Sequence, residues 1–232
     1  PPRSAITSFH QGDTGAWWIG TYTSGLYRVR PLASVIRHDG AGVGTMDDWD
    51  SHSIRAIRRD GARMLIGTDS GLRMRDGPRG GWRAIPGLAD MSVRAIEPAR
   101  DGGWWIGTQV GLRRLYADGR VDRFDGLRDA RIDALLLEGD VLWIGTRSGV
   151  QRLRGGGFEP DPRFAPLAGD MVTTFYRDDD GSLWIGTNTR GLWRLHDGVL
   201  ARVEPPGAGM HRSVWAIHGD ADAIWVGAFA AG

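Results

Sequence analysis

The 232-residue chain contains no cysteine and no lysine. Without cysteine it can form no disulfide, no zinc site on thiolates and no cysteine nucleophile, and without lysine it can form no Schiff base with a substrate. The 29 basic residues, all arginine, are balanced by 28 acidic ones, so no overall excess of positive charge points to nucleic acid. No apolar run is long enough to cross a membrane. These absences exclude several classes of site, and the positive information lies in the 36 glycines and 11 tryptophans.

One five-residue phrase, in its commonest form an apolar residue followed by Trp-Ile-Gly-Thr, occurs six times at intervals of 38 to 47 residues. Each copy is preceded by a short apolar segment and, in most repeats, an Asp-Gly type of turn. The first five copies are followed by Gly-Leu, or by Gly-Val in the fourth, and then by alternating residues. This pattern predicts four short strands per repeat. A period of about 40 residues without helical periodicity predicts an all-β protein, namely a β-propeller of four-stranded antiparallel blades. The copies of the phrase occupy residues 17–21, 64–68, 104–108, 142–146, 183–187 and 224–228.

The repeats set the expected organisation of the chain. Five are complete and the sixth is truncated, so the chain is expected to be a single β-propeller domain or a fragment of one, part of a larger ring with seven blades as one option. A β-sandwich would also be all-β, but it gives no reason for six copies at near-constant spacing. The tryptophan two residues before the glycine is interpreted as packing between blades, not as a platform for a sugar. The expected repeats cover approximately residues 4–51, 52–90, 91–129, 130–169, 170–211 and 212–232.

The phrase Trp-Ile-Gly-Thr followed by Gly-Leu-x-Arg-Leu is most complete in residues 183–195. In this it resembles the two-component regulator propeller repeat, and the resemblance runs through the whole chain. Leu65, Val150 and Ala228 depart from the pattern at packing positions. The family forms extracytoplasmic sensor regions of bacterial hybrid histidine kinases and of some proteins with a diguanylate cyclase output. The resemblance therefore implies a periplasmic or extracytoplasmic location and an output domain in the same longer polypeptide, but it marks no ligand residue.

The variable loops of the repeats are expected to share one face. In a propeller, the loops between strands two and three lie on the same side as the connections between blades, whereas the other side here consists of uniform Asp-Gly turns. Variation on one face of a rigid scaffold indicates recognition. One position of the innermost strand also departs from the repeat, and solvated channel lining is the alternative interpretation of it. This position is occupied by Thr7, Arg55, Arg94, Asp133, Thr173 and Trp215.

Arginine and tryptophan at this position indicate a class of ligand. Arginine suits bidentate recognition of carboxylate or sulfate, and an aromatic ring offers a flat surface for a sugar. We therefore predict that a small anionic or carbohydrate-like molecule, for instance an oligosaccharide, contacts Arg55, Arg94 and Trp215 at the mouth of the channel. The candidate residues further out on the same face are Tyr22, Trp49, Arg147 and Arg190.

The function expected from this pattern is a non-enzymatic sensor that passes ligand recognition to an output domain. A platform for protein interaction or assembly is the first alternative, and a propeller lyase or glycosidase is the second. Streptogramin lyases share the fold, but their catalysis relies on a histidine, and no histidine recurs in the repeat phrase. No catalytic residue is predicted, because aspartates are abundant in the turns and chance pairs carry no information.

Residues 47–52 are rich in aspartate and are the candidate for a metal site. The run of Asp47, Asp48 and Asp50 with His52 matches no known ligand spacing and is interpreted as an exposed loop, so neither a metal nor a cofactor is predicted. Neither nucleic acid nor membrane contact is expected of this segment. The strands of the truncated sixth repeat leave edges that invite pairing with another chain, which makes a homodimer an expected partner.

Overall fold

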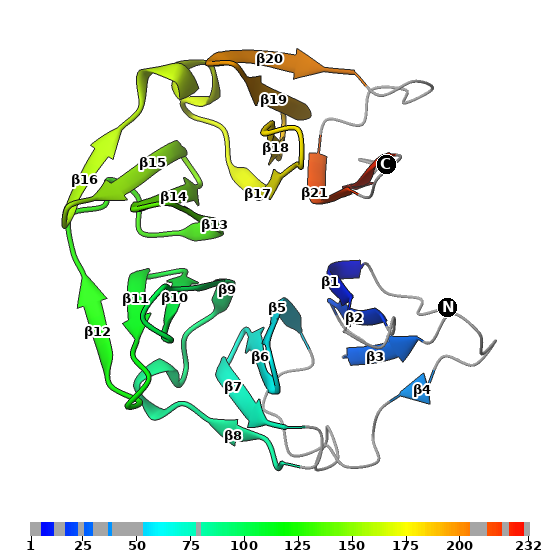
Figure 1. Ribbon diagram of the computed structural model, residues 1–232, viewed down its shortest axis with the longest axis vertical. Helices are drawn as coiled ribbons and strands as arrows, with labels where there is room; N and C mark the ends of the chain where they lie inside the picture. Colours follow the sequence, from blue (N-terminus) through cyan, green and yellow to red (C-terminus); the bar gives the residue numbers. More distant parts are fainter. Residues whose placement is uncertain are drawn as a thin grey trace. The chain divides into compact units, whose positions relative to one another are not determined.

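In the residues that it describes, the computed structural model consists of consecutive antiparallel sheets with two short 3-10 helices (Figure 1). The chain separates into two compact units, one comprising residues 1–109 and 113–123 and the other residues 110–112 and 124–232. The structure describes residues 6–11, 17–22, 26–29, 37–38, 53–77, 80–204, 213–219 and 223–229.

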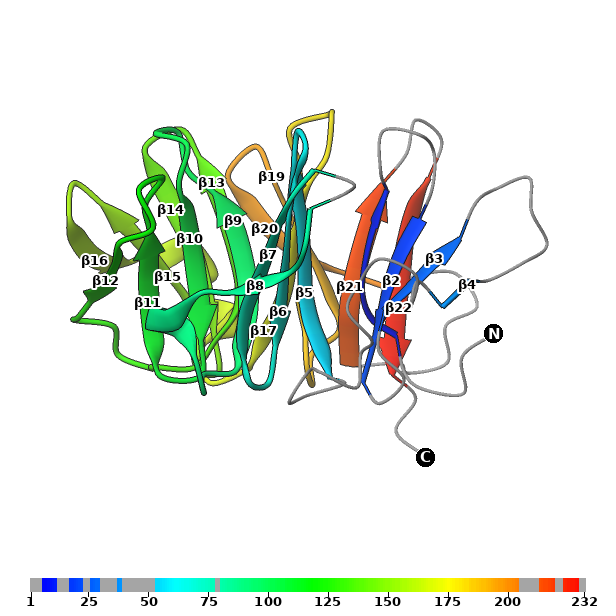
Figure 2. The ribbon, with the colours of Figure 1, turned by 90° about the horizontal axis from the view of Figure 1, so that it is seen from below.

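The first unit is built on three four-stranded sheets, each with its strands in chain order (Figure 2). The first sheet comprises β1 (Ile6–Gln11), β2 (Trp17–Thr21), β3 (Leu26–Val29) and β4 (Arg37–His38). The second comprises β5 (Ile54–Asp60), β6 (Arg63–Thr68), β7 (Gly71–Asp76) and β8 (Arg83–Ala84), followed by the 3-10 helix η2 (Pro86–Leu88). The third comprises β9 (Val93–Pro98), β10 (Trp104–Thr108), β11 (Gly111–Leu115) and β12 (Val121–Phe124).

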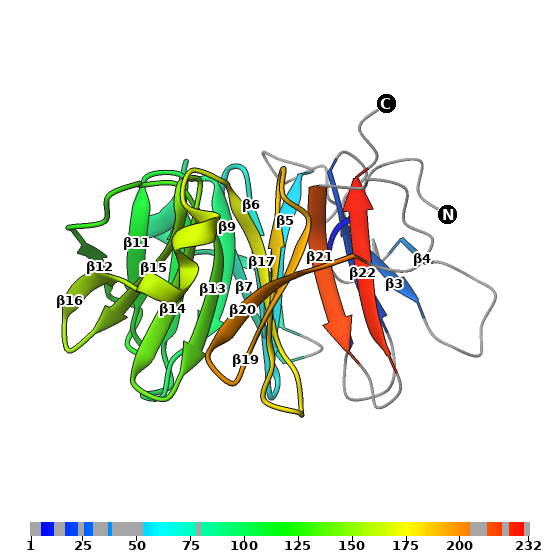
Figure 3. The same cartoon turned by 90° about the horizontal axis from the view of Figure 1, so that it is seen from above.

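The second unit contains two four-stranded sheets and one two-stranded sheet (Figure 3). The first sheet comprises β13 (Ile132–Glu138), β14 (Val141–Thr146), β15 (Gly149–Arg154) and β16 (Gly157–Pro160), followed by the 3-10 helix η3 (Pro162–Leu167). The next comprises β17 (Val172–Arg177), β18 (Leu183–Thr187), β19 (Leu192–His196) and β20 (Val199–Val203). The two-stranded sheet comprises β21 (Ser213–Gly219) and β22 (Ile224–Phe229).

These sheets confirm the all-β propeller with five four-stranded blades. Within the described residues the sixth repeat forms β21 and β22 alone, and both a complete sixth blade and a seventh stay predictions. The predicted hairpin chemistry is also present: Gly102 and Gly181 have φ angles of 79° and 81°, a region that residues with a side chain rarely adopt. The Asp-Gly turns therefore close the connections between the first and second strands.

The glycine of the repeat phrase is required because the next sheet lies against it. A Cβ atom on Gly67 would stand 2.5 Å from the carbonyl oxygen of Val93, and one on Gly145 would stand 2.8 Å from Cγ1 of Val172. Val93 and Val172 are the first residues of the following innermost strands. Each glycine thus permits the close approach of consecutive blades.

The tryptophan of the phrase packs between blades, as predicted. Trp18 shares a hydrophobic core with Ile54 and Ile66 of the next sheet, and Trp143 shares one with Val172 and Leu183. In both tryptophans only 5% of the residue surface is exposed. Burial against the next sheet accounts for the recurrence of this residue without any ligand.

The third strand supplies an arginine directly opposite the tryptophan. Trp184 is opposite Arg194 in the strand register, and the guanidinium carbon of Arg194 lies 5.4 Å from the centre of the indole ring. In the fourth repeat, Trp143 is opposite Arg152 in the strand register. In the second repeat both members change together, because Leu65 is opposite Met74. The departure at position 65 is therefore half of a paired substitution that replaces a tryptophan–arginine contact with an apolar one.

Candidate functional site

The innermost strand of every repeat contains a β-bulge at the same place. In the second repeat Ile54 pairs with Thr68 and Ala56 pairs with Gly67, which leaves Arg55 as the extra residue. A bulge leaves its extra residue without a ladder partner and re-aims that side chain. The bulge is thus the physical reason why this position departs from the repeat. The bulged residues are Thr7, Arg55, Arg94, Asp133, Thr173 and Trp215.

The bulges lie at the same end of each sheet as the loops between the second and third strands. The threonine that ends the second strand pairs with the residue just before the bulge, as Thr68 does with Ile54. The threonine at this position also orders the loop that follows it. In the fourth repeat, Thr146 Oγ1 donates to the carbonyl of Gly149 at 2.9 Å and accepts from the amide of Ser148 at 3.2 Å. We call this end of the sheets the bulge end. It combines a fixed backbone with variable side chains.

In the first unit, the bulge end holds an ion pair between Arg55 and Asp69. Arg55 Nε and Nη2 each donate to one carboxylate oxygen of Asp69 at 2.9 Å, which is a bidentate geometry. Ser92, which precedes the next innermost strand, donates its hydroxyl to the same carboxylate at 2.8 Å. The guanidinium carbon of Arg55 lies 4.8 Å from the centre of the Tyr22 ring. The four side chains connect three consecutive sheets.

The carboxyl group of Asp69 stays ionised in this setting. Partial burial by itself would raise its pKa, but hydrogen bonds from Arg55, Ser92 and Ser53 outweigh that effect and lower the pKa to about 2. The pKa of Arg55 is raised although burial opposes this, because Asp69 holds the charged guanidinium. Both groups are therefore charged at neutral pH, and together they carry no net charge.

In the second unit, the bulge end places Trp215 beside a serine. The indole Nε1 of Trp215 donates to Ser213 Oγ at 2.7 Å, and this hydroxyl donates to Asn188 Oδ1 at 3.2 Å. Asn188 follows the repeat phrase as Asp69 does in the second repeat. The two units therefore use one arrangement, in which the residue after the phrase accepts a hydrogen bond from the serine two residues before the next bulge.

The remaining predicted ligand residues take different positions. Tyr22 is 49% exposed, and Arg94 is half-buried on its bulge. Arg147 and Arg190 are exposed, and Arg190 Nη1 donates to the carbonyl of Pro166. Tyr22 and Arg55 are brought into contact with each other. Trp49 and the acidic run with His52 lie outside the described residues.

Asp69 and Ser92 were not among the predicted ligand residues. Asp69 follows the repeat phrase directly, where the first repeat has Tyr22, and this correspondence could have drawn attention to it. Its contact with Arg55 depends on the bulge, and nothing in the sequence marks a bulge. Ser92 comes from the adjacent sheet, so its approach follows from the packing of blades.

One serine–histidine contact has the composition of a nucleophilic site. Ser182 Oγ lies 2.9 Å from Nδ1 of His196, and His196 Nε2 lies 3.5 Å from Asp197. Ser182, however, is completely buried, and its hydroxyl accepts a hydrogen bond from Arg194 at 2.8 Å. The contact therefore belongs to the packing of the sheet. Within the described ranges, no three His, Asp or Glu side chains converge as metal ligands.

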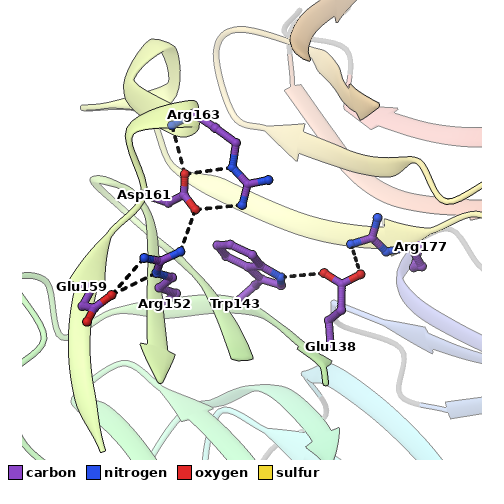
Figure 4. Close-up of polar contacts among 7 residues, drawn as sticks. All are labelled: Glu138, Trp143, Arg152, Glu159, Asp161, Arg163 and Arg177. Atoms are coloured by element: carbon purple, nitrogen blue, oxygen red, sulfur yellow. Dashed lines mark hydrogen bonds and ion pairs between the residues drawn. The ribbon is translucent and has the colours of Figure 1, made fainter. Parts of the chain in front are cut away.

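A second charged cluster lies around β14–β16 and η3 (Figure 4). The buried carboxylate of Asp161 accepts hydrogen bonds from Arg152 at 3.1 Å and from Arg163 at 2.8 and 3.0 Å. These contacts, that with Arg163 first, outweigh burial and lower the pKa of Asp161. Asp161 also accepts from the backbone amide of Arg163 at the start of η3. The cluster fixes the connection between β16 and η3.

Comparison with known proteins bears on the repeat and on the fold. Residues 166–189 match the family described as two component regulator propeller. This segment is therefore similar to a two component regulator propeller repeat. The matched segment contains Leu183–Thr187, the copy of the phrase on which the resemblance rests most fully. No curated protein matches the chain.

Solved structures are similar in fold to this chain over nearly its whole length. The extracellular domain of the putative hybrid two component system BT4673 from B. thetaiotaomicron is 17% identical with a TM-score of 0.68, covering 97% of this chain and 37% of that one. A streptogramin B lyase is 17% identical with a TM-score of 0.73, covering 97% and 77%. PorZ of Porphyromonas gingivalis, a surface component of the type-IX secretion system, is 13% identical with a TM-score of 0.67, covering 96% and 37%.

At these identities the similarity shows the fold, a β-propeller. The chain spans little more than a third of the length of the BT4673 and PorZ structures. In the part of the chain that the structure describes, no helix has the length and apolar character needed to cross a membrane.

Proposed function

We propose that this chain is the recognition part of an extracytoplasmic sensor. It binds a small molecule, such as a saccharide, at the bulge end and passes the event to an output domain of the same longer polypeptide. The observation that carries the proposal is the bulge in every innermost strand, because it presents a variable side chain on a constant backbone. The regulator propeller repeat and the likeness to an extracellular domain of a two component system support the role and the location.

The proposed role is non-enzymatic. The chain is similar in fold to a lyase, but fold alone does not carry a reaction. The serine of the Ser182–His196 contact is buried and is held by Arg194, so we assign that contact to packing. The function then rests on binding residues, for which we propose Arg55, Arg94 and Trp215, with Tyr22, Arg147 and Arg190 further out.

A ligand screen followed by substitution tests this function. Neutral and acidic oligosaccharides are screened by thermal shift, and each binder is then measured by isothermal titration calorimetry on Arg55→Ala, Arg94→Ala and Trp215→Ala. We expect at least one of these changes to weaken binding tenfold or more. Arg202→Ala is the matched control, because Arg202 is an exposed arginine of the outermost strand β20.

Two results would contradict the proposal. A ligand whose affinity survives all three replacements binds elsewhere, and so does one whose affinity falls with Arg202→Ala. If no small molecule binds while the chain associates with itself or with another protein, the result favours an assembly platform over a sensor. Pairing of two copies through β22 stays a prediction, which sedimentation analysis of the wild-type chain can test.

A further inference from the structure

The ion pair at the bulge end changes what Arg55 can bind. A carboxylate or sulfate binds a guanidinium best through a pair of N–H groups, and one such pair of Arg55, on Nε and Nη2, already donates to Asp69 at 2.9 Å. A negatively charged ligand at this place also meets the carboxylate of Asp69, which is ionised at neutral pH. The arginine that the sequence marks as an anion contact is therefore occupied by a carboxylate of its own sheet.

The pair is nevertheless open to an uncharged ligand. The side chain of Arg55 is 18% exposed and that of Asp69 is 35% exposed. A guanidinium has five N–H donors, so N–H groups remain beyond the two that Asp69 receives, and carboxylate oxygens can accept further hydrogen bonds. A hydroxyl group both donates and accepts, and so it suits a neighbouring donor and acceptor at once. Tyr22, half-exposed beside Arg55, adds an aromatic surface.

The site is assembled before any ligand arrives. Asp69 is fixed by Arg55 from its own sheet and by Ser92 from the next sheet, while Arg55 rests on Tyr22 of the preceding sheet. Side chains that are already ordered lose little conformational freedom on binding. The site therefore discriminates between ligands by their charge, and its side chains need not rearrange on binding.

We propose that Asp69 is a specificity-determining residue of this site, which neutralises Arg55 and thereby makes the site reject anions and accept uncharged ligands rich in hydroxyl groups. The proposal rests on the proposed function and adds to it a residue and a ligand class. Arg94, on the next bulge, also carries a positive charge, so its contribution has to be separated in the test.

Asparagine at position 69 is the substitution that isolates the charge. Asn188 occupies the corresponding position of the fifth repeat and accepts a hydrogen bond from Ser213 there, as Asp69 does from Ser92. Asp69→Asn is thus compatible with the fold of a repeat. It removes the negative charge, and because an amide has one acceptor oxygen it also ends the bidentate contact with Arg55. Asp69→Gln is the second variant, because the third repeat carries Gln109 at this place. Thermal melting checks that both variants fold.

The probes are tetragalacturonate and its fully methyl-esterified form, which differ in charge and share the sugar. Titrations are done at low ionic strength, where electrostatic differences are largest. We expect no measurable binding of tetragalacturonate to wild type, and binding to Asp69→Asn with an affinity at least tenfold above the detection limit of the titration. We expect the gain to disappear in Asp69→Asn/Arg55→Ala and to persist in Asp69→Asn/Arg94→Ala.

Asp76→Asn is the matched control. Asp76 accepts hydrogen bonds from Arg63 at 2.8 Å and Arg83 at 3.3 Å, and it ends β7 away from the bulge end. Its replacement also releases arginines from a carboxylate, but at another place. An equal gain of anion binding in this control would overturn the proposal.

Two further results would overturn it. One is binding of tetragalacturonate to wild type that Arg55→Ala abolishes, because it shows that Asp69 does not block the arginine; the proposed recognition at the bulge end would then still stand. The other is the absence of any gain in the folded Asp69 variants. A different result would refute the proposed function: molecules that bind the wild-type chain would bind Arg55→Ala, Arg94→Ala and Trp215→Ala with unchanged affinity.

Discussion

Replacement of the repeated tryptophan tests the packing of the blades, because the chain offers the same position in two environments. Trp143 is 5% exposed, whereas Trp225, at the same place of the last phrase, is 61% exposed. Trp143 packs edge-on against Phe164 with ring centres 5.3 Å apart, and its Nε1 donates to Glu138 at 3.1 Å. The two residues differ in burial and share their place in the sequence pattern.

The expected magnitudes follow from this difference. Removal of a buried tryptophan costs about 3 to 5 kcal/mol, through lost burial and the cavity that remains. For a chain of this size that corresponds to a melting temperature lower by roughly 6 to 20 °C. Trp225→Ala removes a side chain that is mostly in water already, and about 1 kcal/mol or less is expected. Trp143→Ala should therefore lose several times more stability than Trp225→Ala.

Denaturant titration followed by circular dichroism is the suitable assay, because tryptophan fluorescence changes with the substitution itself. The slope of the free energy against denaturant should be the same for both variants and the wild type, so that the midpoints can be compared. Equal losses of stability in the two variants would refute the packing role of Trp143. A larger loss in Trp225→Ala would refute it as well.

Three other substitutions examine the phrase and the bulge end. Gly145→Ala should lower the free energy of unfolding by about 1 to 3 kcal/mol, because the added Cβ is overpacked against the next sheet. Gly157 lies in the same sheet as Gly145, and a Cβ there would meet only a carbonyl oxygen at 3.9 Å, so Gly157→Ala should be nearly neutral in the same denaturant titration. Thr146→Val should cost about 1 to 3 kcal/mol, because a buried carbonyl loses its donor and an amide its acceptor; a melting curve unchanged by the substitution would contradict this. The pKa of Asp69, about 2 against 3.8 for the ordinary group, means that the unfolded chain takes up its proton first as the pH falls. Its contribution to stability is therefore complete above about pH 4 to 5 and is lost toward pH 2, and Asp69→Asn should flatten the acid unfolding profile over that window.

The fold was predictable from the sequence because the repeat phrase carries a packing requirement at each position. Gly145 has to admit Val172, Trp143 fills the space between two sheets, and Thr146 orders the loop that follows. Requirements of this kind recur with every blade, so they leave a period in the sequence. The paired change of Leu65 and Met74 is read as one substitution only when the register is known.

The candidate site was predictable only in part. The position that holds Arg55 stands out because it breaks the repeat, but the cause, a bulge, depends on the pairing of two strands and leaves no mark of its own. The anion expected at Arg55 rests on the residue type and its place in the repeat, because arginine suits bidentate recognition of carboxylate or sulfate. The carboxylate of Asp69 lies fourteen residues away, and only the folded sheet brings it to the guanidinium.

The bulge has a consequence for how such a protein changes over evolutionary time. An extra residue that the ladder does not use can be exchanged without disturbing the register, which explains how one position accommodates threonine, aspartate, arginine and tryptophan. Mutations at well-separated sites act almost additively. Each repeat therefore offers a site of variation that is coupled only to its neighbours, as Arg55 is to Tyr22 and Ser92. New binding preferences can then arise through changes in adjacent blades while the scaffold is inherited unchanged.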